Sequence, residues 1–175
     1  MDRLDRVSIW AIVALIISSF ALMSLHMGEA RPDRSVEQKR AASDYAAASV
    51  EMGGRVKQIK NMIEGDSLGK AEAMTGDLIQ KYPYEGEPRM LMGDILMRRQ
   101  EAVKAMLEYK EAIDLNPDYL DKKTPLFEGK KLKIAVGEAL AEIDRKARLS
   151  PDDESLRADR KLIYYLQRKI AGSCS

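Results

Sequence analysis

The first pattern along the chain is an uninterrupted apolar run from Val7 to Leu25. Its 19 residues, VSIWAIVALIISSFALMSL, carry no charge and include only serines as polar breaks. A helix of this length spans roughly 28 Å, close to the thickness of the hydrocarbon core of a bilayer. Trp10 lies near one end of the run, where an indole suits the membrane interface. The run predicts one transmembrane helix, with its short preceding tail, over residues 1–25.

A cleavable signal peptide is the main alternative to this anchor. Gly28-Glu29-Ala30 places small residues at a plausible cleavage site. The apolar run is longer than the roughly 7–15 residues of a typical signal peptide, which favours an uncleaved anchor. A buried core helix is the third interpretation, and it is disfavoured because the run has no polar face.

The orientation of the anchor is not decided by the flanking charges. Basic residues lie on both sides of the run in similar number, so the positive-inside rule favours neither orientation. A short tail before a single span is the usual layout of a bacterial signal anchor. This layout favours a single-pass protein of the bacterial inner membrane, with its soluble domain in the periplasm.

The next segment, residues 26–54, is only weakly apolar. A capping-box pattern begins at Ser35 and predicts a helix from there to about Met52. Gly53 and Gly54 are expected to interrupt that helix. We expect this segment to be a partly helical spacer between the membrane and the domain, with a first packing helix as the alternative.

Beyond the spacer, alanine and proline recur with a period of 34 residues. The recurring residues are the alanines Ala71, Ala105 and Ala139 and the prolines Pro83, Pro117 and Pro151. A small alanine lets the second helix of a hairpin approach the first, and a proline ends that helix. A fixed period of this length is typical of tetratricopeptide repeat (TPR) arrays. The pattern predicts helical hairpins over residues 55–171, followed by a tail at residues 172–175.

The middle copy, residues 86–119, resembles the TPR family most fully. The family pattern is W-x2-L-G-x2-Y, followed by A-x3-F, a later alanine and a proline. In this copy the tryptophan is lost, while the glycine, both alanines and the proline are kept. The residues at these positions are Arg89, Met92, Gly93 and Leu96 in the first helix and Ala105, Tyr109, Ala112 and Pro117 in the second. Gly93 has no Cβ atom and therefore permits close contact between the two helices.

The flanking copies depart further from the family pattern. In the first copy, the segment from Glu64 to Ser67 predicts a turn between two helices. In the third, Thr124 and Pro125 resemble a helix start, and one long helix to Leu149 is favoured over two short ones. A final helix over residues 152–171, with acids at its start, has an apolar stripe at helical spacing. It is expected to cap the array.

The predicted fold class is therefore all-α, with TPR-type helical hairpin repeats and a C-terminal capping helix, preceded by one transmembrane helix. The charges nearly cancel, with 29 basic and 28 acidic residues, so a nucleic-acid partner is not expected. One cysteine, Cys174, and one histidine, His26, cannot form a Cys/His zinc site within one chain. No phosphate loop, nucleophile elbow or paired-carboxylate motif is visible, so neither catalysis nor a cofactor is expected.

The TPR resemblance implies a protein partner, a peptide or a helix, bound along a concave face formed by the first helix of each repeat. Laying the helical register on the three copies assigns one set of residues to that face, with the membrane contacted through residues 7–25. The set is Lys60, Glu64, Met90, Asp94, Met97, Arg98, Glu128 and Lys131. A solvated helix face, with the methionines filling gaps, is the alternative for the same residues.

The anchor and the repeats together are similar to bacterial inner-membrane TPR proteins of cytochrome c maturation and nitrite-reductase haem attachment. The resemblance covers about residues 52–151, and the second span found in some of those proteins is missing. It implies a membrane-tethered scaffold that assists assembly of a membrane or periplasmic complex, with cytochrome c maturation as the pathway. The alternative is a permanent structural accessory subunit of a single membrane complex.

Overall fold

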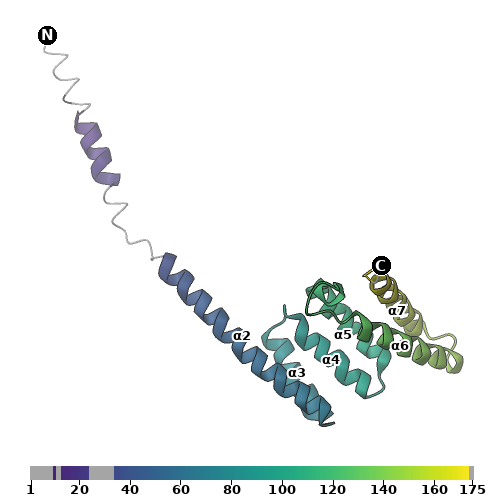
Figure 1. The fold of residues 1–175 in the computed structure, drawn as a ribbon. Helices are drawn as coiled ribbons and strands as arrows, with labels where there is room; N and C mark the ends of the chain where they lie inside the picture. The colour runs from purple at the N-terminus through teal and green to yellow at the C-terminus, as the bar shows by residue number, and fades with distance from the viewer. Residues whose placement is uncertain (1–9, 11–12, 24–33, 174–175) are drawn as a thin grey trace. The chain divides into compact units, whose positions relative to one another are not determined.

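The computed structural model describes residue 10, residues 13–23 and residues 34–173 of the 175-residue chain. These residues form helices joined by turns and loops, with no strand among them, so the predicted all-α class is confirmed (Figure 1). The chain divides into two compact units, residues 1–49 and residues 50–175.

The first unit contains part of the predicted anchor. Residues 13–23 are helical and exposed, whereas the remainder of the apolar run apart from Trp10 lies outside the described residues. The alternative cleavage site at residues 28–30 also lies outside them. Within the described ranges, no helix is both long and apolar enough to cross a membrane.

Helix α2 runs without a break from Arg34 to Glu64, so the predicted interruption at Gly53 and Gly54 is wrong. A Cβ atom at either glycine would meet nothing within 4 Å, so neither glycine serves a close contact. Each glycine costs about 1 kcal/mol relative to alanine in a helix. Burial of three apolar side chains in the remaining turns of α2, among them Ile59 at 0% exposure, offsets that cost.

Beyond α2, the second unit consists of helices that fold back on one another. Short turns join them, except for one longer connection that contains a 3₁₀ helix. The elements are α3 (Leu68–Lys81), α4 (Gly86–Arg98), α5 (Ala102–Leu115), the 3₁₀ helix η1 (Pro117–Leu120), α6 (Gly129–Leu149) and α7 (Glu154–Ser173). Helix α4 packs against α3 and α5, and α5 packs against α6 and α7 (Figure 1). One core cluster contains residues from the last turns of α2 and from α3 and α4. A second cluster contains residues from α4, α5, η1, α6 and α7.

The turn predicted between Glu64 and Ser67 is confirmed, because α2 ends at Glu64 and α3 begins at Leu68. Asp66 adopts φ of 56°, in the left-handed region that Asp tolerates better than most residues. The backbone N–H of Ser67 then donates to the carbonyl of Met62 at 2.8 Å, which satisfies a group at the end of α2.

The third copy folds as one long helix, as predicted, but the predicted start at Thr124 and Pro125 is wrong. Helix α6 begins later, at Gly129. The hydroxyl of Thr124 donates to the carbonyls of Asp118 and Asp121 at 2.9 and 3.0 Å. This hydroxyl closes the loop after η1 and is not used as a helix cap, so the pair lies in a loop.

The final helix, α7, begins at Glu154. The carboxylate of Asp153 accepts hydrogen bonds from the backbone N–H and the hydroxyl of Ser155, at 2.8 and 2.7 Å. Asp153 thereby satisfies one of the free N–H groups of the first turn. The predicted apolar stripe packs inward, with Ile163 and Leu166 at 0% and 1% exposure.

Candidate interaction surface on the helical hairpins

Gly93 of α4 and Tyr109 of α5 form a close contact between the two helices. A Cβ atom at Gly93 would lie 2.4 Å from the Tyr109 ring, so the ring rests directly on the backbone of α4. Only a residue without a Cβ atom fits under the ring. The expectation that Gly93 permits close approach of the two helices is confirmed.

Tyr109 also anchors a polar network that joins three helices. Its hydroxyl donates to Oδ1 of Asp94 at 2.7 Å, and Nζ of Lys131 in α6 lies 3.0 Å from the same oxygen. The Lys131 ammonium is 5.8 Å from the centre of the Tyr109 ring and 3.4 Å from the Glu128 carboxylate. Burial, followed by the charge of Asp94, raises the pKa of the Tyr109 phenol well above 10.0, so the hydroxyl remains a donor.

Beside this network the surface is hollowed, with a volume of about 460 Å³, and we call this depression the interhelical hollow. It combines apolar side chains with charges of both signs. Its lining residues are Ile63 of α2, Asp94, Met97 and Arg98 of α4, Tyr109 of α5, and Lys131, Ile134, Ala135 and Glu138 of α6. Ile134 is 66% exposed and offers an apolar surface there. The hollow can therefore take up apolar and charged groups together.

Half of the predicted groove residues lie in this hollow. Asp94, Met97, Arg98 and Lys131 are brought together there from α4 and α6. The prediction is wrong for Met90, which is 4% exposed and packs in the core cluster shared by α4, α5 and α6. The flexible, unbranched side chain of methionine can fill an irregular gap in such a core.

The other three predicted residues are not among those that line the hollow. Lys60 of α2 forms an ion pair with Glu87 of α4, with Nζ and Oε1 2.8 Å apart. Glu128 precedes α6 and pairs with Lys131, as described above. Glu64 is exposed at the last residue of α2.

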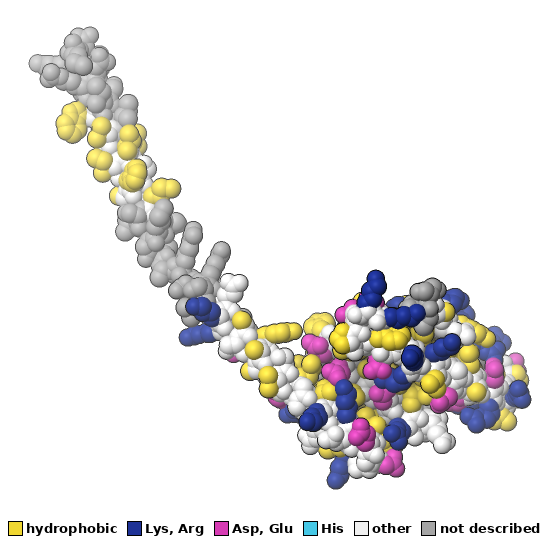
Figure 2. Space-filling model, viewed as in Figure 1, with side chains coloured by type: hydrophobic (Ala, Val, Ile, Leu, Met, Phe, Trp, Pro, Cys, Tyr) yellow, Lys and Arg dark blue, Asp and Glu magenta, His cyan; other side chains and the backbone are white. Residues whose placement is uncertain are grey.

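Five residues that line the hollow were not predicted. They are Ile63, Tyr109, Ile134, Ala135 and Glu138. A signal for Ile134 and Glu138 existed, because they follow Lys131 at helical spacings of three and seven residues. The long helix predicted to end at Leu149 already contained these residues, and their spacing places them on the face of Lys131. Figure 2 shows basic and acidic side chains interspersed over the visible face of the second unit.

Comparisons of the chain with protein-family models, with curated proteins and with solved structures give no match.

Proposed function

We propose that this protein is a membrane-tethered scaffold whose TPR-type hairpins hold a protein partner during assembly of a membrane or periplasmic complex. The observation that carries the proposal is the interhelical hollow, to which α2, α4 and α6 each contribute. These are the first helices of successive hairpins, the set that forms the binding face in the TPR family. The TPR interpretation is further supported by the Gly93–Tyr109 contact.

The chemistry of the hollow suits a peptide or a helix of a partner. Ile134 and Met97 offer apolar contact, and methionine adapts to varied side chains. Arg98 and Glu138 form no ion pair within the described part of the chain, so both can pair with charges of a partner. The Asp94–Lys131 pair is already held by Tyr109 and would provide a rigid reference point.

The proposed tether is the uncharged run of residues 7–25, whose 19 residues match the hydrocarbon thickness. We place the anchor in the bacterial inner membrane and the hairpins in the periplasm. Cytochrome c maturation is the pathway that the resemblance favours. Recovery of haem-lyase components or an apocytochrome with the protein, at native expression, tests that pathway directly.

The scaffold proposal is tested by photo-crosslinking from within the hollow. A photoreactive phenylalanine analogue replaces Ile134, which is 66% exposed and lines the hollow. The matched control places it at Leu126, which is 46% exposed and not in the lining. We expect a discrete protein adduct from the first site only. Equal adducts from both sites, or none from either, would contradict the proposal.

Membranes that contain the photoreactive variant also distinguish a transient scaffold from a permanent accessory subunit. After mild detergent extraction, a permanent subunit migrates with its complex on a native gel. A scaffold that releases its client is recovered mainly apart from that complex, with the adduct at Ile134 formed only while assembly proceeds.

A further inference from the structure

Helix α6 repeats the arrangement of residues that forms the contact between α4 and α5. In both helices a basic residue is followed, at fixed spacing, by an apolar residue, a glycine, an acid and a leucine. The residues are Arg89, Met92, Gly93, Asp94 and Leu96 in α4 and Lys133, Val136, Gly137, Glu138 and Leu140 in α6. The equal spacing gives each glycine the same position among its neighbours on the helix.

The two glycines have different surroundings. The ring of Tyr109 fills the space above Gly93, where a Cβ atom would lie 2.4 Å from it. A Cβ atom at Gly137 would meet nothing within 4 Å. Instead, a hollow of about 500 Å³ opens there between α6 and α7, and we call it the Gly137 hollow. Among the described residues, an aromatic ring covers the first glycine and none covers the second.

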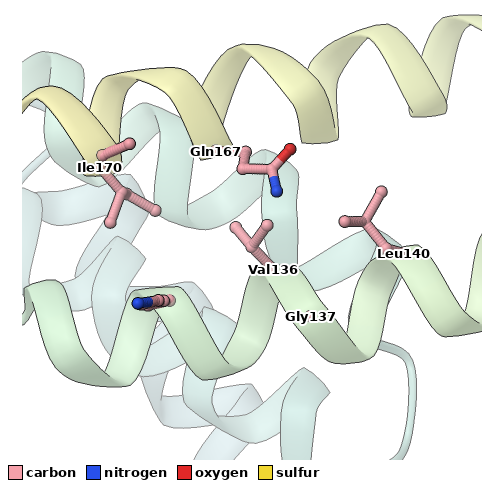
Figure 3. Close-up of a pocket in the computed structure, with 7 residues that line it drawn as sticks. Val136, Gly137, Leu140, Gln167 and Ile170 are labelled. Atoms are coloured by element: carbon pink, nitrogen blue, oxygen red, sulfur yellow. The ribbon is translucent and has the colours of Figure 1, made fainter.

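The Gly137 hollow has apolar walls and a polar edge (Figure 3). Val136 and Leu140 extend from α6 toward α7, and Ile170 extends from α7 toward α6. Ala171 adds a short apolar side chain, and Gln167 and Lys133 are the polar residues of the lining. Apolar walls with few polar groups are typical of sites that take up an apolar ligand group.

An open glycine inside a helix is not by itself a sign of a ligand, because a Cβ atom at Gly53, Gly54 or Gly76 would also meet nothing within 4 Å. Gly137 differs from these glycines because it lines a hollow and stands in the arrangement of residues that surrounds Gly93. In α4 the ring of Tyr109 covers the glycine, whereas α7 presents the short Ala171 and the polar Gln167 beside Gly137. A ring from another molecule would complete at Gly137 the contact that Tyr109 makes at Gly93.

We propose that the Gly137 hollow is a docking site for an aromatic side chain of the protein partner. The proposal rests on the scaffold function and names the chemistry of the partner's anchoring residue. Charge complementarity supports it, because Lys133 forms no ion pair within the described residues and its ammonium can lie against an electron-rich ring. Lys131 stands in that relation to Tyr109, at 5.8 Å from the ring centre.

The hollow is tested without any partner by titrating the full chain, in lipid nanodiscs, with p-cresol, the side-chain analogue of tyrosine. The amide signal of Gly137 is followed by NMR. We expect a saturable shift, and at least about fivefold weaker binding of cyclohexanol, which has a similar size and a hydroxyl but no aromatic ring. No saturable shift with p-cresol, or equal affinity for both compounds, would overturn the proposal.

Two variants locate the binding. Gly137→Leu fills the hollow from its floor and improves helix propensity, so it should fold and lose p-cresol binding. The matched control is Gly76→Leu in α3, where a Cβ atom also meets nothing within 4 Å, and its binding should be unchanged. Lys133→Gln should weaken p-cresol binding about two- to fivefold, the range of an exposed cation–π contact. Undiminished binding by Gly137→Leu would show that p-cresol binds elsewhere.

The crosslink from position 134 then tests whether the protein partner occupies the Gly137 hollow. If the hollow holds the partner's aromatic residue, Gly137→Leu should lower the crosslink yield at least about fivefold relative to Gly76→Leu. An unchanged yield would overturn the assignment of the hollow to the partner. Failure of the scaffold function itself looks different, because the crosslink would then be missing from the chain with Gly137 intact.

Discussion

The carboxylate of Glu142, in the middle of α6, accepts a hydrogen bond from the backbone N–H of Val103 at the start of α5, at 2.9 Å. Glu142 is 8% exposed, and its second partner is the Lys146 ammonium, 2.6 Å away. The first turn of a helix has free N–H groups and a partial positive charge. Helix α5 is therefore capped by a side chain of the next hairpin, which couples the two hairpins.

We predict that Glu142→Gln lowers the free energy of unfolding by about 1–3 kcal/mol at pH 7, because a charged acceptor of a buried hydrogen bond is replaced by a neutral one. Urea unfolding of the full chain, followed by circular dichroism, measures the change. Glu138→Gln is the matched control on the same helix. Its side chain is exposed, and the change should stay within about 0.5 kcal/mol.

The same carboxylate predicts a dependence of stability on pH. Burial alone would raise the pKa of Glu142, but hydrogen bonds from Lys146 and from the backbone of Val103 and Ala102 outweigh it and hold the pKa below 4.5. A lowered folded-state pKa stabilises the fold above about pH 4.5, and that contribution is lost as pH falls through the folded-state pKa. The difference between the original chain and Glu142→Gln should therefore shrink from pH 5 downward. A constant difference down to the acid unfolding limit would contradict the assignment.

The contact of Gly93 with Tyr109 predicts that Gly93→Ala is strongly destabilising. The added methyl group would lie 2.4 Å from a ring that is 1% exposed and tied through its hydroxyl to Asp94. Overpacking of this kind costs about 1–3 kcal/mol or more. Gly76→Ala is the control, because its methyl group meets nothing within 4 Å and should raise stability by up to about 1 kcal/mol. Thermal unfolding of both variants should thus shift in opposite directions.

Tyr109→Phe separates the ring from its hydroxyl. The ring still covers Gly93, but Asp94 loses the donor at 2.7 Å and keeps Lys131. We expect a loss of about 1–2 kcal/mol in the free energy of unfolding, since the acceptor is ionised and part-buried. Tyr84→Phe, at a side chain that is 86% exposed, should change little. An equal effect of both substitutions would contradict a structural role for the Tyr109 hydroxyl.

The sequence was most informative about Gly93, because this residue stands at the glycine position of the family pattern. That pattern predicted close contact between two helices at Gly93, and the structure identifies the ring of Tyr109 as the group in contact. The face of α4 that carries Asp94 and Arg98 followed from helical register. Register gives a direction along the helix but not the depth of burial, and Met90 is on that helix yet packs in the core.

The wrong predictions arose where local chemistry competes with tertiary contacts. Thr124 and Pro125 have the composition of a helix start, but the Thr124 hydroxyl bonds the carbonyl of Asp118, six residues earlier, and no periodic pattern reveals that bond. Gly53 and Gly54 weaken α2 locally, while burial of Ile59 and its neighbours sustains it. The Gly137 hollow remains open because the α7 side chains beside Gly137 do not fill it. The sequence alone does not show which residues of α7 lie beside Gly137.

The proposed orientation in the membrane is tested with the single cysteine, Cys174, which lies near the C-terminus and outside the described residues. We expect a membrane-impermeant maleimide to label it in intact spheroplasts, because the hairpins would lie in the periplasm. Full labelling after denaturation confirms that the thiol is not blocked. Labelling only after permeabilisation would place the domain in the cytoplasm. In that case the cytochrome c maturation proposal fails, while the predictions for Glu142 and Gly137, which concern packing within the second unit, are unaffected.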